Sequence, residues 1–328
     1  MRTKTIIAAF AASAAVFTGC LKNETVPMEH PATSKLTVNV SCDIDSKAVG
    51  INAEDNEKKI NSVQVFVFSA DNKLEAEAYG TAPTLEMVTT KGEKTVRVLV
   101  NHERLTTVTM LSDWTNYVAE LEVNKTNSFL MTGEESITVN DNKVNLSTVV
   151  TRQVTKVVLK KITNNMALTQ YQGSPVKVVG IYLINVVGHS PLQGWKEPTR
   201  WLNKGGRDSA ENSIYAEFPA SKTISFGSAD SSEHYFYCLQ NPTSSDSQAD
   251  TWCARHTRLV LEAQIDGKTC YYPITLPPLK PNHIYTINNL TLTRPGTDSP
   301  DMTDPLSSMS FNLQVQPWSN ETVSDVTI

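Results

Sequence analysis

Few residues of this 328-residue chain stand in an order that could support a covalent reaction. His256 follows Cys253 by three positions, which puts an imidazole near a thiol. A nucleophilic cysteine also needs a group that orients its base, and this spacing in a loop or strand fixes no such arrangement. Ser174 and Lys177 have the order of a serine–lysine dyad, but that dyad relies on a helical turn and Pro175 favours extended chain. We therefore predict no catalytic residue.

Other motifs that bind metals, phosphates or nucleic acids do not occur in the sequence. It contains no His-Glu-x-x-His, no Gly-x-Ser-x-Gly and no glycine-rich phosphate loop. The six histidines show no metal-ligand spacing. The net charge of -5 argues against a nucleic-acid partner. We expect a protein that is not an enzyme and that holds no metal and no cofactor.

The clearest expected chemistry concerns Cys20, near the start of the chain. Two basic residues precede an uncharged apolar run over residues 6–17, which is too short to span a bilayer as a helix. The run ends in Thr18-Gly19-Cys20, the type of sequence that a lipoprotein signal peptidase accepts. We expect a signal peptide over residues 1–19 and a lipidated tether over residues 20–34, with the lipid on Cys20 as the only attachment to a membrane.

Four further cysteines leave the disulfide state open. An exported chain can hold disulfides, and a bond between Cys238 and Cys253 would close a polar loop. Cys42 falls on the apolar face of a predicted strand, so we expect it to be a buried thiol. Cys270 has no assigned partner. The Cys238–Cys253 pair is the one candidate disulfide.

The elements that must position these residues are mainly strands. Apolar residues alternate with polar ones from residue 36 to residue 44, which predicts a half-buried strand. A polar loop covers residues 46–59. One short amphipathic helix is expected to start near Ser112, on the spacing of Leu111, Trp114, Val118 and Leu121. Further β-patterned runs are separated by turn residues and prolines; they cover residues 60–69, 95–100, 136–139, 154–162, 176–187, 234–239, 258–265, 270–276 and 284–292. The pattern predicts an all-β fold of two tandem β-sandwich domains with little helix, over residues 35–148 and 149–328.

The C-terminal segment also has a strand pattern, although terminal tails are usually polar and frayed. Apolar residues alternate from Phe311 to Val315, and apolar residues recur from Val323 to Ile328. Pro317 cannot donate to a ladder of hydrogen bonds, so it divides the segment into a strand of its own sandwich and an arm beyond it. The arm needs a surface against which to bury its apolar side chains.

Ordered pieces of the chain resemble the fimbrillins of Bacteroidales, which are subunits of type V pili. After the lipobox at Cys20, the pieces are KLTVNV, DSKAVG, INSVQVFVFSADNKLEA, VRVLVN, FLMTGEE, VVTRQVTKVVLKKI, YYPITLPPLKPNHIYTINNLTLTRPGTDSP and NLQVQPW. Each piece alone is weakly specific, but their order and spacing are fairly specific. The resemblance implies two transthyretin-like β-sandwich domains.

The resemblance also implies assembly by strand exchange. In such subunits a surface protease cuts the loop after the first strand, and the vacated groove accepts a C-terminal strand of another subunit. In this chain, the corresponding cleavage site lies between Lys47 and Ala48. The displaced strand presents Leu36, Val38, Val40, Cys42 and Ile44, and the donor strand presents Phe311, Leu313, Val315, Val323, Val326 and Ile328.

One departure concerns the cleavage site, where the family typically has Thr-Arg-Ala and this chain has Lys47. No arginine occurs between Arg2 and Arg97, so a protease specific for arginine has no site in this loop. Either a trypsin-like protease that accepts lysine cuts at Lys47, or also at Lys58 or Lys59, or the subunit is not processed in this way.

The leading hypothesis is a fimbrial stalk subunit that contributes to adhesion and biofilm formation. We expect the protein to be exported first as an outer-membrane lipoprotein precursor and then to become part of a cell-surface fimbrium. Its expected partners are other copies of itself, accessory fimbrial subunits and a processing protease, with receptors that the sequence does not name. The alternatives are an anchor or tip subunit that keeps its lipid, and a surface glycan-binding lipoprotein that uses Trp195, Trp201 and Trp252 as stacking platforms.

Overall fold

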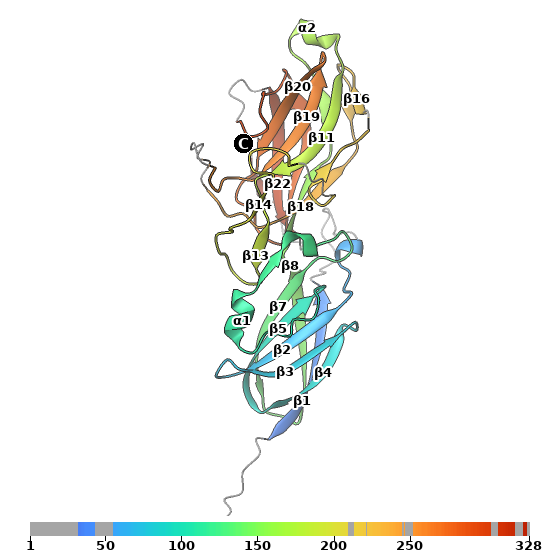
Figure 1. Ribbon diagram of the computed structural model, residues 1–328. Coiled ribbons are helices and arrows are strands. Elements are labelled where there is room, and N and C mark those ends of the chain that lie inside the picture. The colour runs from blue at the N-terminus through green and yellow to red at the C-terminus, as the bar shows by residue number, and fades with distance from the viewer. Residues whose placement is uncertain are drawn as a thin grey trace, which may run out of the picture. The chain divides into compact units, whose positions relative to one another are not determined.

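The computed structural model describes residues 32–42, 55–208, 213–220, 222–244, 246, 252–302, 308–318 and 324–326. These residues form an almost entirely β structure, as predicted (Figure 1). The helical elements among them are the α-helices α1 (Leu111–Asn116) and α2 (Thr169–Gln172) and the single-turn helices η1 (Asp55–Glu57) and η2 (Leu121–Val123). The expected signal peptide and most of the tether lie outside the described residues.

The first half of the chain forms one sheet in the order β3-β2-β5-β7-β8-β1-β4. Its strands are β1 (Thr33–Cys42), β2 (Val63–Ser69), β3 (Leu74–Gly80), β4 (Thr84–Thr90), β5 (Gly92–Val100), β7 (Met131–Val139) and β8 (Lys143–Arg152). β7 pairs with β5 along its whole length but with β8 at only two positions. The sheet turns at this short junction, so inward side chains of β1 share one core with those of β2 and β5.

The second half contains two larger sheets. One has the order β17-β10-β21-β22-β23 and also includes β9 and β18, and the other has the order β15-β11-β19-β20 and also includes β16. Two small pairs, β12 with β14 and β13 with β6, complete the fold. The bounds of these strands are β6 (Val118–Glu120), β9 (Val154–Leu159), β10 (Ile162–Asn164), β11 (Val176–Ile184), β12 (Val186–Val187), β13 (His189–Pro191), β14 (Trp201–Leu202), β15 (Ala216–Glu217), β16 (Lys222–Ile224), β17 (Ala229–Asp230), β18 (His234–Leu239), β19 (Arg258–Ile265), β20 (Lys268–Thr275), β21 (His283–Leu292), β22 (Met309–Pro317) and β23 (Ser324–Val326).

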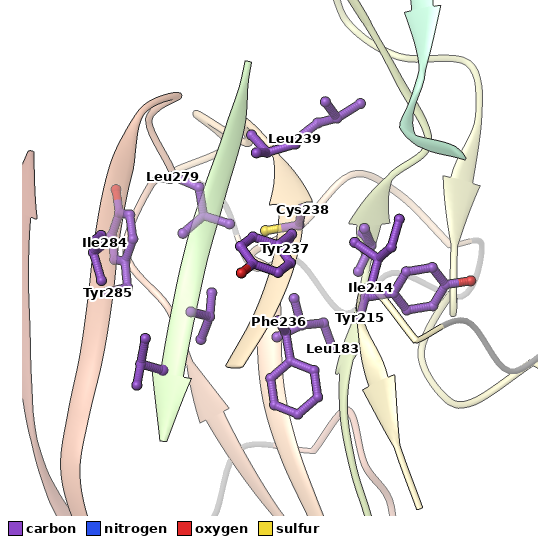
Figure 2. Close-up of a cluster of buried hydrophobic side chains, with 14 of the residues drawn as sticks. Leu183, Ile214, Tyr215, Phe236, Tyr237, Cys238, Leu239, Leu279, Ile284 and Tyr285 are labelled. Atoms are coloured by element: carbon purple, nitrogen blue, oxygen red, sulfur yellow. The ribbon is translucent and has the colours of Figure 1, made fainter. Parts of the chain in front are cut away.

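The core of the second half surrounds β18, whose residues are buried on both faces. In Figure 2 its side chains lie between Ile284 and Tyr285 on one side and Leu183 on the other. A strand that is buried on both faces has a continuous run of apolar residues in its sequence. β18 has such a run from Tyr235 to Leu239. Burial raises the pKa of the Cys238 thiol to about 12.

The candidate disulfide between Cys238 and Cys253 is not formed in the structure. Cys238 is fully buried in β18, where its residue pairs with Thr155 of β9. The Sγ atom of Cys253 lies 4.0 Å from Nη2 of Arg255. Cys42 is a buried thiol on the inner face of β1, which agrees with its place in the sequence pattern.

Two boundaries differ from the sequence reading. The helix near Ser112 ends at Asn116, because Val118 begins β6 and pairs with Pro191 of β13 instead of continuing the helix. The predicted domain boundary between residues 148 and 149 lies inside β8. The change from the first sheet to the second comes between Arg152 and Val154.

Glu75 on β3 connects three strands of the first sheet. Its carboxylate forms an ion pair with Nζ of Lys94 on β5 at 2.8 Å, and it accepts a hydrogen bond from the backbone N–H of Thr90 at the end of β4. The Lys94 side chain is buried and that of Glu75 is largely covered. Burial raises the pKa of Glu75, but the hydrogen bonds from Lys94 and Thr90 outweigh it and lower the pKa to about 2.

We expect Glu75→Gln to lower stability at pH 7 and to have little effect at low pH. Because the folded-state pKa of about 2 lies below the ordinary value of 4.5, the ionised carboxylate stabilises the fold above pH 4.5. That contribution is lost as the pH falls from 4.5 towards 2. Urea unfolding of both proteins across this pH range tests the expectation.

The control is Glu86→Gln, which removes an exposed ion pair with Lys35 and should change the stability little at any pH. A stability difference for Glu75→Gln that stays constant down to pH 2 would contradict the assignment.

Candidate functional site

β1 has a hydrogen-bonded neighbour on each side and is not an edge strand. It runs antiparallel to β4 over residues 33–39 and parallel to β8 over residues 35–42. Figure 1 shows it, in blue, alongside β4. Removing β1 would therefore break two ladders and leave two facing strand edges with unpaired backbone groups.

The inner face of β1 is buried in the core of the first half. Leu36 and Val38 are fully buried, and Val40 and Cys42 are nearly so. They belong to the same cluster as the inward valines of β2 and β5. Burying a valine or leucine side chain contributes about 1.5 to 3 kcal/mol, so the three aliphatic residues alone contribute roughly 5 to 9 kcal/mol. That amount is comparable with the whole stability of an ordinary domain. Ile44, the fifth predicted position, lies outside the described residues.

The expected cleavage site at Lys47 and Ala48 lies outside the described residues, as does the lipidation site at Cys20. The description resumes at Asp55, and two positions later Glu57 is fully buried. Its Oε1 atom accepts hydrogen bonds from Nζ of Lys156 and from the hydroxyl of Tyr237, both at 2.6 Å. Its backbone carbonyl accepts a hydrogen bond from Nε of Arg152 at 2.9 Å. The chain is therefore fixed at Glu57.

The fixed region extends from Glu57 to Asn61. Asn101, held at a φ of 61°, donates from Nδ2 to the carbonyl of Lys59 at 2.7 Å. Its Oδ1 accepts a hydrogen bond from the backbone N–H of Asn61, also at 2.7 Å. The carbonyl of Lys59 is thus engaged in a hydrogen bond with the body of the protein.

Trp318, the residue after β22, packs on the same group of side chains. The guanidinium of Arg152 lies 4.7 Å from the centre of its ring, and the Tyr237 ring is stacked on it at 5.9 Å. The backbone N–H of Trp318 donates to the carbonyl of Asn282 at 2.7 Å. We name Glu57, Arg152, Lys156, Tyr237 and Trp318 the anchor cluster. It holds the chain that follows the expected cleavage loop and the chain that precedes the expected arm.

The C-terminal segment divides at Pro317, as predicted. β22 pairs with β21 from Met309 to Pro317, so Phe311, Leu313 and Val315 belong to the sheet of their own chain. Leu313 is fully buried and the other two are partly buried. Val326 is part of β23, which pairs with β22 opposite Leu313. Val323 and Ile328 lie outside the described residues.

The three tryptophans proposed as stacking platforms have different environments. Trp201 is buried, and its Nε1 donates to the carbonyl of Pro198 at 3.2 Å. Trp252 is partly buried and packs edge-on against Trp201 with the ring centres 5.3 Å apart. Trp195 is 39% exposed, so it is the one of the three that can present a ring face to a ligand.

The sequence analysis missed the anchor cluster. Glu57 stands among charged and polar residues, whereas Lys156 interrupts the apolar run of β9, which is a signal of a buried cation that needs a partner. The two residues are 99 positions apart, so the sequence does not show that they form a pair. Within the described ranges, no three histidine, cysteine or acidic side chains gather as a metal site. None of the helices described is long and apolar enough to cross a membrane.

Comparisons with known proteins agree with this arrangement. Residues 34–170 match the family described as major fimbrial subunit protein (FimA). Fifty-six solved chains match this one in structure comparison. A candidate cell adhesion protein from Bacteroides eggerthii has a TM-score of 0.67 and 15% identity, over 88% of this chain and 97% of that one. A fimbrilin (FimA) from Porphyromonas gingivalis has a TM-score of 0.61 and 18% identity, over 88% and 99%. A comparison with curated proteins finds no match.

A third solved structure is a C-terminally truncated tip fimbrial protein, Mfa3, from Porphyromonas gingivalis. It has a TM-score of 0.53 and 14% identity, over 87% of this chain and all of that one. At such low identities these likenesses show the fold, whereas the match of residues 34–170 concerns the sequence itself. The resemblance expected from the sequence is therefore confirmed, because residues 34–170 match the major fimbrial subunit family and the described chain has the fold of fimbrilins and candidate cell adhesion proteins from Bacteroidales.

Proposed function

We propose that this fimbrial subunit forms the stalk of a fimbrium, and that it is exported as a lipoprotein and polymerised by strand exchange after proteolysis. The observation that carries the proposal is the position of β1, a central strand with a fully buried inner face directly after the expected tether. The proposed role is structural and not catalytic.

Strand exchange follows from what the loss of β1 would expose. The edges of β4 and β8 would lose their partner, and the core of the first half would lose its cover of apolar side chains. An incoming strand with alternating apolar residues can restore both the ladders and the apolar cover, which is the physical basis of β-strand addition. Because the lipid precedes β1, the same cut would release the subunit from the membrane.

The structure favours a cut at Lys47 over one at Lys58 or Lys59. A cut at Lys58 or Lys59 would separate Glu57 from the body of the subunit and leave the ammonium of Lys156 buried without its carboxylate. Leaving a buried charge uncompensated typically costs about 3 to 5 kcal/mol. The carbonyl of Lys59 is also held by Asn101. A cut at Lys47 keeps Glu57, and therefore the anchor cluster, in the processed subunit.

The proposed donor is the arm after Trp318, with Val323, Val326 and Ile328 as its buried residues. The strand that presents Phe311, Leu313 and Val315 stays in its own sheet, since β22 pairs with β21 over nine residues. In the described part of the arm, β23 pairs with β22 at three positions, and this short pairing would have to open for the arm to reach another copy. Trp318 packs in the anchor cluster and therefore holds the residue from which the arm begins.

The proposed partners are other copies of this chain, accessory fimbrial subunits and a protease that accepts lysine. The location would be an outer-membrane lipoprotein precursor and then a cell-surface fimbrium with a role in adhesion and biofilm formation. An anchor or tip subunit is the second candidate, because Lys47 in place of arginine favours a subunit that keeps β1 and its lipid.

Limited trypsin treatment of the purified, unlipidated precursor should yield a new N-terminus at Ala48 and ladders that resist SDS. The Lys47→Gln variant should give neither, whereas Lys58→Gln/Lys59→Gln should behave like the parent. N-terminal sequencing and unheated SDS gels measure both outcomes. Ladders from Lys47→Gln, or no ladder after a verified cut at Lys47, would sink the proposal and favour an anchor or tip role.

Replacing the three apolar arm residues should abolish ladders without altering the fold. Each lost apolar side chain removes about 1.5 kcal/mol or more of burial, so Val323→Ser/Val326→Ser/Ile328→Ser should weaken strand donation by a factor of roughly 1,000 or more. The matched control is Thr322→Ala/Ser324→Ala/Thr327→Ala, which alters the intervening positions. Cleavage rate, melting temperature and ladder length are compared. Ladders of normal length from the first variant would refute the arm as donor.

Lys156→Met should destabilise the processed subunit by about 3 kcal/mol, because it leaves the carboxylate of Glu57 buried without its cation. Adding Glu57→Gln should recover part of that loss, since the remaining buried group is then neutral. Urea unfolding of the two single variants and the double variant gives the coupling energy. Strictly additive effects would show that the two side chains do not act as a pair.

A further inference from the structure

A hollow of about 580 Å³ lies beside β7 and β8. Its volume falls in the range of about 300 to 1,000 Å³ that is usual for small-molecule sites. Strands and loops from both halves of the chain line it. The side chains that bear on its chemistry are Arg97, Glu134, Gln153, Gln193, Trp195 and Gln240.

Trp195 lies on a hydrogen-bonded loop, with its side chain 39% exposed. It follows Gly194, whose φ of 74° lies in the region that favours glycine. Nε2 of Gln240 donates to the carbonyl of Gly194 at 2.6 Å, and Nε2 of Gln193 donates to Oε2 of Glu134 at 2.9 Å. The loop is therefore tied to its surroundings at Gly194 and at the residue before it. Binding to an aromatic ring on such a loop costs less conformational freedom than binding to one on a loose loop.

The described polar side chains that line the hollow carry no net charge, and all of them except those of Thr132 and Thr151 are planar. Among the described lining residues Arg97 and Glu134 are the charged ones, and Nη2 of Arg97 lies 3.2 Å from Oε2 of Glu134. Their charges offset each other. Gln153 is positioned by a hydrogen bond of 2.6 Å from its Nε2 to Oγ1 of Thr132. The hollow thus presents amide, carboxylate and guanidinium groups around one aromatic face.

We propose that this hollow binds a neutral saccharide, with a pyranose ring stacked on Trp195. A pyranose ring has an apolar C–H face that suits an indole and hydroxyl groups that both donate and accept hydrogen bonds. Side-chain amides donate and accept hydrogen bonds and a carboxylate accepts them, each in the plane of the group, which matches a row of hydroxyls. A phosphate or another acidic ligand would require an unpaired cation, and Arg97 is already paired with Glu134.

Among the described residues that line the hollow, none belongs to β1. Saccharide binding can therefore be measured on the chain that still carries β1. A stalk subunit with this site would carry repeated, weak saccharide contacts along a fimbrium, which together can give high avidity. The other occupant of a hollow beside a strand edge would be the arm of a second copy, and the experiment below separates the two.

The test is calorimetric titration of the purified chain with three neutral oligosaccharides, namely mannohexaose, maltohexaose and cellohexaose. We expect saturable binding of at least one of them, at least tenfold weaker for Trp195→Ala and partly retained by Trp195→Phe. The matched control is Phe226→Ala, which removes an exposed aromatic side chain outside the hollow and should leave binding unchanged. Equal melting temperatures establish that Trp195→Ala is folded.

A synthetic peptide of residues 319–328 is titrated in parallel. Binding of this peptide that Trp195→Ala removes, without saccharide binding, would overturn the proposal in favour of the arm of a second copy. Absence of binding by all three oligosaccharides at millimolar concentration would also overturn it. So would saccharide binding that Trp195→Ala and Phe226→Ala weaken to the same extent.

Discussion

Burial of β1 between β4 and β8 is the constraint on which the rest of the structure depends. Loss of an edge strand breaks one ladder of hydrogen bonds. Loss of a central strand breaks two ladders and also uncovers one side of the hydrophobic core. The first half of this chain is therefore complete only while some strand occupies that position. In the proposed strand exchange, such a fold would be stable before processing and would accept the strand of another copy afterwards.

The anchor cluster holds the chain in place at Glu57 and at Trp318. Glu57 and Trp318 are 261 positions apart, yet both contact side chains from β8, β9 and β18. One lies after the expected cleavage loop and the other before the expected arm. The parts proposed to change, β1 and the arm, lie outside the segment between these two residues. Buried ion pairs contribute little net stability, so a role in specifying position suits this one better.

Much of the fold could be predicted from local pattern, because half-buried strands alternate with a period of two. The alternation from Leu36 to Cys42 located β1, and Pro317 marked the end of β22. Other features depend on contacts between distant segments. Nothing near Trp195 or Trp201 in the sequence shows that one is exposed and the other buried. Glu57 and Lys156 form a pair only because β9 and η1 meet in space. The shorter α1 has the same origin, since Val118 pairs with β13.

The most direct test of strand exchange asks what Val326 contacts in the polymer. A photo-crosslinking amino acid at position 326 reports its neighbours before and after processing. Before processing, the crosslink should form within one chain, to β22 near Leu313, which pairs with Val326. In SDS-resistant ladders it should form between copies, to residues of β4 or β8 such as Met87 or Val150, which flank β1. Crosslinks in the ladder that still join Val326 only to β22 of its own chain would contradict the account.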